Sequence, residues 1–314
     1  MEQEETKVQI GLSFDSFVIE RWMRERDVFV SAAKELGAEV NVQNANGDVQ
    51  DQISQIEYFI RKQVDVIVVV AGDCEALTDV MIKAREAGIK TVSYDRLIQN
   101  AGCDLYISFD NTEVGRLMAR SLLENIPDGG DIFLIQGPLT DHNVTLVREG
   151  IDETLAGSNL SVVYESNCAG WIAENAYTYT KEGLKQDRYV KGIICGNDDL
   201  ASQAFRALSE ERLAGKVYVT GQDGDLAACQ RIVEGTQEMT AFKSVEQEAS
   251  MAAKCAVLLG LGEEIEEARS TAYDGTYQVP YLELQPIAVT GENMDEVIIK
   301  GGFHAKEDVY LNVN

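Results

Sequence analysis

The feature that most constrains the fold is a strand and helix pattern that recurs through the first half of the chain. Four apolar runs rich in β-branched residues begin at Lys7, Ala38, Val64 and Lys90, which lie 31, 26 and 26 residues apart. A segment with helical spacing separates each run from the next, and a glycine such as Gly37 marks the end of a helix. Strands and helices that alternate in this way form a parallel sheet, so the sequence predicts an α/β fold.

The same pattern resumes in the second half of the chain. After a strand-like segment at 106–110, further apolar runs begin at Asp131, Leu160, Lys191, Lys216 and Met239. We expect helices over 20–36, 51–63, 75–87, 112–125 and 246–261, and a hairpin turn at 274–275. The 314 residues give room for two domains, and no Ser/Gly-rich linker divides the chain, so short ordered crossings should join them.

The charge balance limits the possible partners. The chain has 53 acidic and 27 basic residues, which gives a net charge of −26. Such a field repels phosphate backbones and anionic lipid surfaces, so we expect neither nucleic acid nor a membrane surface as a partner. Solubility is the simplest reason for so acidic a surface.

Cysteine usage and hydropathy exclude further classes. The six cysteines show no close pairs, so the sequence predicts neither a zinc site nor a disulfide framework, and most should be small buried residues. No run approaches the roughly 18 apolar residues of a spanning helix. The opening residues, MEQEETK, lack a charged-then-apolar leader, so we expect the chain as written to be soluble, and the removal of a signal segment or lipid anchor stays open as an alternative.

Polar side chains follow the expected strands at the points where the strands end. They are Asp15, Asp95 with Arg96, Asn197 with Asp198, Asp223 and Lys243, together with Asn143 in the loop after the run from Asp131. The carboxyl ends of parallel strands are where ligands bind in open α/β sheets. Carboxylates accept hydrogen bonds, whereas Arg, Lys and amide groups donate them, so this set suits the hydroxyl groups of an uncharged sugar.

Two structural alternatives remain open for these residues. Asp15, Asn197 and Asp198 could equally be helix caps, as Asp and Asn often are. Capping does not explain Arg96 or Lys243, because a cation near a helix start opposes the helix dipole.

The two tryptophans fall one in each half, near the expected ligand edge. The rings of Trp22 and Trp171 could pack on the C–H face of a sugar. Trp22 could instead be a core residue, because Phe29, Ala33 and Leu36 share its helix.

The sequence offers little material for catalysis or for a cofactor. The only histidines are His142 and His304, and no glycine-rich nucleotide cradle follows a strand. Asp95 and Asp223 could form a glycosidase pair, but Arg96 would keep Asp95 ionised and unsuited to be the general acid. The segment at 44–51 lacks the closing glutamate of a calcium loop and should be a turn. We therefore expect no enzyme activity, no cofactor and no metal.

Several segments carry a resemblance to a known family. They are IERW (19–22), QISQIEYFI (52–60), YDRLI (94–98), YISFDN (106–111), GQDGDLA (221–227) and GGFH (301–304). From about residue 7 to residue 304 the chain resembles the xylose-binding proteins of bacterial ABC importers, within the ribose/galactose-type periplasmic-binding superfamily. Two features depart from the family: the loop GPLTDHN, where relatives tend to have paired asparagines, and the six cysteines.

The resemblance implies a type I periplasmic-binding fold, in which two Rossmann-like lobes with parallel sheets are joined by a three-segment hinge. The N-terminal lobe would comprise residues 1–109 and 243–281, and the C-terminal lobe residues 110–242 and 282–314. The chain would cross from one lobe to the other near residues 109–111, 241–243 and 280–284. An aldopentose would lie in the cleft between the lobes.

The resemblance also assigns sugar contacts residue by residue. They fall on Arg21, Trp22, Asp95, Arg96, Asn143, Trp171, Asn197, Asp223 and Lys243, of which Arg21 comes from the resemblance alone.

The implied function is that of a monomeric extracytoplasmic receptor that captures D-xylose and delivers it to an ABC permease. An alternative keeps the sugar but presents the closed form to a membrane histidine kinase. A cytoplasmic repressor domain would need an N-terminal helix-turn-helix, for which MEQEETK leaves no room.

Overall fold

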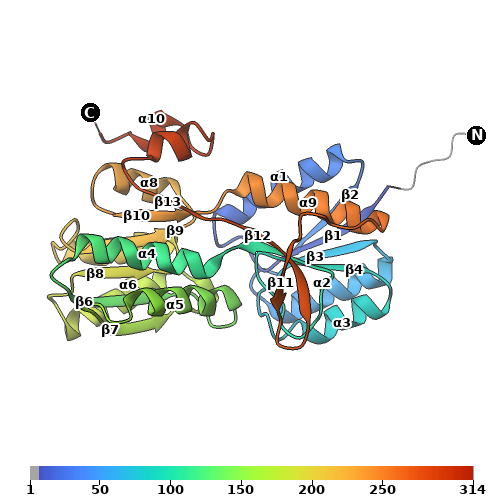
Figure 1. Ribbon diagram of the computed structural model, residues 1–314, viewed down its shortest axis with the longest axis horizontal. Coiled ribbons are helices and arrows are strands. Elements are labelled where there is room, and N and C mark those ends of the chain that lie inside the picture. Colours follow the sequence, from blue (N-terminus) through green and yellow to red (C-terminus); the bar gives the residue numbers. More distant parts are fainter. Residues whose placement is uncertain (1–6, 314) are drawn as a thin grey trace, which may run out of the picture. The chain divides into compact units, whose positions relative to one another are not determined.

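The computed structural model describes residues 7–313, which form two compact α/β units (Figure 1). The first unit contains the chain up to residue 109, residues 140–143 and residues 244–284. The second contains residues 110–139, 144–243 and the chain from 285 onward. The opening MEQEET, in which we expect neither a leader nor a DNA-binding helix, lies outside the described residues.

The first unit is built on a sheet whose strands are parallel except at one edge. The strand order is β11-β12-β5-β4-β3-β1-β2, and only β11 runs antiparallel, to β12. The strands are β1 (Gln9–Phe14), β2 (Glu39–Asn44), β3 (Val66–Val70), β4 (Lys90–Tyr94), β5 (Leu105–Phe109), β11 (Ser270–Tyr273) and β12 (Gln278–Leu284). The VIVVV sequence of β3 is buried along its whole length, as expected for a central parallel strand covered on both faces.

Two pairs of helices cover this sheet. The helices are α1 (Arg21–Glu35), α2 (Val49–Lys62), α3 (Thr78–Glu86) and α9 (Val245–Leu261). Helix α1 packs on α9 and α2 packs on α3, and the two pairs lie on opposite faces of the sheet in Figure 1. The core between the sheet and helices α2 and α3 includes Ile56, Phe59, Ile67 and Val69.

The second unit repeats this plan. Its strand order is β13-β10-β9-β8-β6-β7, and all neighbours are parallel except β13, which is antiparallel to β10. The strands are β6 (Gly130–Gln136), β7 (Leu160–Asn167), β8 (Gly192–Cys195), β9 (Tyr218–Gln222), β10 (Met239–Phe242) and β13 (Ile287–Val289). The helices are α4 (Asn111–Asn125), α5 (His142–Leu155), η1 (Ala169–Trp171), α6 (Glu174–Gln186), α7 (Asp198–Glu210), α8 (Leu226–Val233), η2 (Asp295–Ile299) and α10 (Lys306–Val309).

These elements confirm the predicted α/β fold with two mainly parallel sheets and the hairpin between β11 and β12. Helix α3 begins at Thr78 rather than at residue 75, because the Asp73 carboxylate accepts the backbone N–H groups of Glu75 and Ala76 and holds them in a turn. The turn expected within 44–51 occupies residues 45–48, because Asn44 ends β2 and α2 begins at Val49, and its Asp48 caps α2 by accepting two backbone N–H groups.

The two units differ slightly from the expected lobes, 1–109 with 243–281 and 110–242 with 282–314. The first unit extends to residue 284, because β12 pairs with β5 as far as Leu284. It also gains residues 140–143, which are tied to it by Asp141, Asn143 and a hydrogen bond from the Cys74 N–H to the Thr140 carbonyl.

The six cysteines are free and buried, which confirms the expectation of small buried residues. Burial raises the pKa of the Cys103 thiol to about 11 and that of Cys74 to about 12, so neither is a thiolate at neutral pH. Within residues 7–313, no helix combines the length and apolar character needed to cross a membrane.

A close crossing of α4 and α5 yields a stability prediction. A Cβ atom at Gly150 would lie 1.9 Å from the Thr112 carbonyl oxygen, and one at Gly115 would lie 2.0 Å from that of Val147. Gly150→Ala should therefore force the helices apart and lower the free energy of unfolding by about 1–3 kcal/mol in urea denaturation. The matched change Glu149→Ala, on the exposed face of α5, should cost less than about 0.5 kcal/mol. Equal stability of the two variants would contradict the packing argument.

Candidate functional site

The nine predicted sugar contacts divide between the two units and are all buried. The first-unit set comprises Arg21, Trp22, Asp95, Arg96 and Asn143, and the second-unit set comprises Trp171, Asn197, Asp223 and Lys243. Five of the nine, Asp95, Arg96, Asn197, Asp223 and Lys243, come within two residues of the end of a strand of their unit, at the carboxyl edge of its sheet.

Arg96 is the centre of the first-unit set. Its Nη1 donates to Asp15 Oδ2 at 3.0 Å and to the Ala71 carbonyl at 2.8 Å, and its Nε lies 2.9 Å from Asp141 Oδ2. Burial alone would lower the pKa of Arg96, but the carboxylates of Asp141, Asp15 and Asp95 outweigh it and raise the pKa above its usual value. The guanidinium thus joins the ends of β1, β3 and β4 to the segment 140–143. No helix starts after Arg96, where the chain leads into β5, so the dipole argument does not apply to it.

Asp95 and Asn143 form a fixed pair beside Arg96. The Asn143 Nδ2 donates to Asp95 Oδ1 at 2.8 Å and to the Asp95 carbonyl at 3.1 Å. The backbone of Asp95 has φ of +60°, a left-handed conformation that an Asp residue adopts at a cost. Among the described residues, the Asn143 Oδ1 is buried and has no hydrogen-bond partner, so this acceptor is available to a ligand hydroxyl.

Arg21 and Trp22 complete the first-unit set at the start of α1. Arg21 Nη2 donates to Glu25 at 2.5 Å and to Glu248 at 2.6 Å, and its Nη1 lies 3.6 Å from Asp95 Oδ2.

Trp22 lies beside both arginines of the set. The guanidinium carbon of Arg21 lies 4.7 Å from the centroid of its ring, and that of Arg96 lies 5.5 Å from it. Trp22 therefore belongs to the polar cluster as well as to the core, and cation–π contacts hold both arginines against it. Its buried Nε1 has no hydrogen-bond partner within residues 7–313.

The first-unit cluster carries an excess of acid. Arg21 and Arg96 are accompanied by five carboxylates, those of Asp15, Glu25, Asp95, Asp141 and Glu248. Burial raises the pKa of Glu25 despite the opposing charge of Arg21, and the Tyr94 hydroxyl donates a hydrogen bond to that carboxyl. An environment of this sign favours an uncharged or cationic ligand over an anion.

In the second unit, Asp223 and Lys243 form a buried ion pair. Lys243 Nζ lies 3.2 Å from Asp223 Oδ1, and the Asp223 N–H donates to the Ala241 carbonyl at 3.0 Å. The two residues follow the neighbouring strands β9 and β10, as the alternation of strands predicted. Asp223 has φ of +97°, so its backbone is strained.

Asn197 is a helix cap, which was one of the two interpretations that the sequence left open. Its Oδ1 caps α7 by accepting the Leu200 N–H at 2.9 Å, whereas its buried Nδ2 has no hydrogen-bond partner in the described chain. The residue is thus a cap through one atom and a candidate ligand donor through the other. Asp15 instead pairs with Arg96, and Asp198 accepts hydrogen bonds from within its own unit.

Trp171 packs against the end of β6. A Cβ atom at Gly137 would lie 2.3 Å from ring atom Cζ2, so only glycine allows this contact. Seven described residues other than glycine have a positive φ, and three of them, Asp95, Trp171 and Asp223, belong to the two sets. Strained backbone of this kind clusters at binding sites, where the surrounding structure maintains it.

Three residues of the cluster were missed by sequence reasoning. Glu25 is four residues after Arg21 on one helix face, a spacing that could have suggested the pair. Glu248 lies 227 residues from Arg21, and Asp141 lies in an irregular loop, so neither has a local signal.

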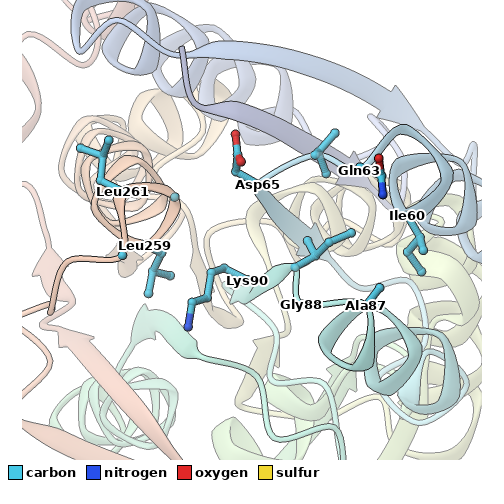
Figure 2. Close-up of a pocket in the computed structure, with 12 residues that line it drawn as sticks. Ile60, Gln63, Asp65, Ala87, Gly88, Lys90, Leu259 and Leu261 are labelled. Atoms are coloured by element: carbon cyan, nitrogen blue, oxygen red, sulfur yellow. The ribbon is translucent and has the colours of Figure 1, made fainter. Parts of the chain in front are cut away.

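A separate groove lies at the opposite, amino edge of the first sheet (Figure 2). It encloses about 460 Å³ and is lined by the ends of α2, α3 and α9 and by residues such as Asp65 and Lys90 at the starts of strands. No residue of either set lines it. Among residues 7–313, no group of three or more His, Cys, Asp or Glu side chains is arranged to hold a metal ion.

Comparisons with known proteins agree on one family. The family model described as "Periplasmic binding protein domain" matches residues 10–264. The chain is 43% identical to the D-xylose-binding periplasmic protein of Haemophilus influenzae, over 96% of this chain and 92% of that protein. It is 40% identical to the D-xylose-binding periplasmic protein of Escherichia coli, over 96% and 93% of the two chains.

A solved structure shows the same architecture. The ABC transporter solute-binding protein of Clostridium phytofermentans, with bound β-D-glucose, superposes with a TM-score of 0.88 at 25% identity. The match covers 96% of this chain and 99% of that one.

The capping role of Asn197 can be tested by its effect on stability. Asn197→Ala removes the cap and should lower the free energy of unfolding by about 1 kcal/mol, whereas Asn197→Ser keeps a capping oxygen and should retain most of it. Thermal and urea unfolding of the three proteins would measure the difference. Equal losses in both variants would show that the cap is not what Asn197 contributes.

Proposed function

The chain belongs to the periplasmic binding protein family, and from this premise we propose that it captures D-xylose outside the cytoplasm and delivers it to an ABC permease. Identities of 40–43% to two proteins named for D-xylose support the choice of sugar. The word periplasmic in both names supports the location. Its relatives are binding proteins, which agrees with the expectation that the chain is not an enzyme.

The observation that carries the proposal is the buried hydrogen-bonding chemistry of the two sets. Asp95 and the Asn143 Oδ1 offer acceptors, the Asn197 Nδ2 offers donors, and the Asp223–Lys243 pair offers both. Each hydroxyl of a sugar donates and accepts, so it can be satisfied by such a mixture. Hydrogen bonds to charged groups contribute about 1.5–3 kcal/mol each. Two or three of them, with apolar contact, reach the roughly 8 kcal/mol of micromolar binding.

We propose that both sets contact the same sugar, Trp22 and Trp171 among them. Sugar binding then stabilises the arrangement of the two units in which both sets reach the ligand. That arrangement is what the permease would recognise. We propose that the protein acts as a monomer.

The alternative partner is a membrane histidine kinase in place of the permease. Affinity capture from solubilised membranes, with and without xylose, would detect it.

Isothermal titration calorimetry with sugars tests the proposal directly. D-xylose should bind with micromolar or tighter affinity, and ribose, arabinose, glucose and galactose should bind more weakly. D-xylonate, which resembles the open chain but carries a carboxylate, should show no binding, because five carboxylates surround the two arginines of the first-unit set. Failure of all five sugars to bind would reject the sugar proposal, and tight xylonate binding would reject the charge argument.

Arg96 should be central to affinity. Arg96→Ala removes the guanidinium that holds Asp15 and Asp141 beside the proposed sugar contacts and leaves both carboxylates without it, and should weaken xylose binding by about 2–3 kcal/mol, or roughly 30- to 150-fold. Arg116→Ala, which removes a partly exposed arginine of α4 paired with Glu153, provides the matched control and should bind as the parent does. Unchanged affinity in a folded Arg96→Ala protein would remove Arg96 from the site.

A further inference from the structure

We propose that Asp198 is a positioning residue for sugar binding in the second unit. Its buried carboxylate holds together the ends of β8, β9 and β10, which carry Asn197, Asp223 and Lys243. The inference rests on the proposed function, because it assigns a role toward the same sugar, although we place Asp198 behind the ligand and not in contact with it.

The carboxylate of Asp198 accepts four hydrogen bonds. Its Oδ2 accepts the backbone N–H groups of Gly224 at 2.9 Å and Asp225 at 3.1 Å, and the Thr240 hydroxyl at 2.7 Å. Its Oδ1 accepts the Gln237 Nε2 at 3.0 Å. The first two bonds fix the turn that begins at Asp223, and the third fixes β10 three residues before Lys243. Asn197 is the residue directly before Asp198, so one side chain links all three strand ends.

The surroundings leave Asp198 little freedom to move. A Cβ atom at Gly221 would lie 2.2 Å from Asp198 Oδ1, so the carboxylate fits only against a glycine of β9. The turn itself is strained, with φ of +97° at Asp223 and +75° at Gly224. His304 also holds this turn, because its Nε2 donates to the Gly224 carbonyl at 2.8 Å. A strained turn keeps its geometry only while such contacts persist.

A buried arginine, Arg231, compensates the charge of Asp198 indirectly, through Gln237. Gln237 donates to Asp198 and accepts a hydrogen bond from Arg231 Nε at 3.0 Å, and Arg231 Nη1 donates to the Ser202 hydroxyl at 2.9 Å. The titratable and charged groups that face Asp198 or its turn are Asp223, Asp225, Arg231, Cys195, Cys229 and His304, and Lys243 pairs with Asp223.

The protonation state of Asp198 provides a readout. Burial raises the pKa of its carboxyl to about 7, against the opposing hydrogen bond from Thr240. All four partners of the carboxylate are donors, so an added proton would find no acceptor among them and would remove the negative charge that strengthens their hydrogen bonds, which should loosen the turn. The ionised form of Asp198 is therefore the one that holds the proposed sugar-binding residues in place. Lowering the pH through 7 should weaken sugar binding, and sugar binding near pH 7 should release protons.

The experiment is calorimetry with D-xylose between pH 6 and pH 8.5, in buffers of different ionisation enthalpy. The parent protein should bind about tenfold more weakly at pH 6 than at pH 8, because the competent fraction falls by about that factor, and should release a fraction of a proton at pH 7. Asp198→Asn should bind about tenfold more weakly at pH 8 and show no pH dependence. Asp48→Asn, which alters a helix cap in the other unit, should match the parent throughout.

His304→Gln separates the two titratable groups that hold the turn. It keeps an N–H donor for the Gly224 carbonyl and should preserve the pH profile. Loss of the profile in this variant would assign the proton to His304 and overturn the inference.

The remaining outcomes are equally decisive. A parent protein that is folded and binds xylose with the same affinity from pH 6 to pH 8.5 overturns the inference, as does an Asp198→Asn protein with parental affinity. If Asp198→Asn does not fold, the parent protein provides the test: release of protons on xylose binding at pH 7 supports the inference, and no release overturns it. A parent protein that binds none of the sugars at any pH instead overturns the proposed function.

Discussion

Buried charges must be neutralised by partners, and this requirement shapes the candidate site of the first unit. Arg96 is almost fully buried, so its guanidinium is stable only among acceptors. Those acceptors come from the ends of β1 and β3 and from the segment 140–143, which lies outside the continuous sequence of that unit. The ion pairs therefore place Asp95 and Asn143, and a broken pair would leave a buried charge that costs several kcal/mol.

The second unit also has to neutralise a buried charge, that of Asp198, and it does so mainly with hydrogen-bond donors. Within residues 7–313 no arginine pairs directly with Asp198, and its charge is satisfied by four donors and by an indirect contact with Arg231 through Gln237. A buried ion pair of this unit, Asp223 with Lys243, lies at the ends of β9 and β10, where both side chains are among the proposed sugar contacts. In both units, rigid polar contacts behind the proposed ligand atoms reduce the freedom that binding would otherwise have to remove.

Much of the fold could be predicted from the sequence because its signals are local. Apolar runs at regular spacing gave the parallel strands, and the residues directly after them gave Asp95, Arg96, Asn197, Asp223 and Lys243. The ion pairs of Arg21 could not be predicted in this way. One of its partners, Glu248, is on a helix that packs on α1 from the far end of the chain, and Arg21 itself was proposed only through the family resemblance. The way Asn197 caps α7 with its Oδ1 and leaves its Nδ2 for the proposed ligand was also beyond sequence reasoning, because it depends on which amide atom faces the helix.

The central claim is that buried polar groups of both units bind one uncharged sugar. A crystal structure of the protein grown with D-xylose tests it most directly. The account predicts sugar hydroxyls within hydrogen-bonding distance of Asp95 and Asn143 from the first unit and of Asn197 and Asp223 from the second. Ordered sugar that contacts neither pair, for example in the groove beside Asp65 and Lys90, would contradict it.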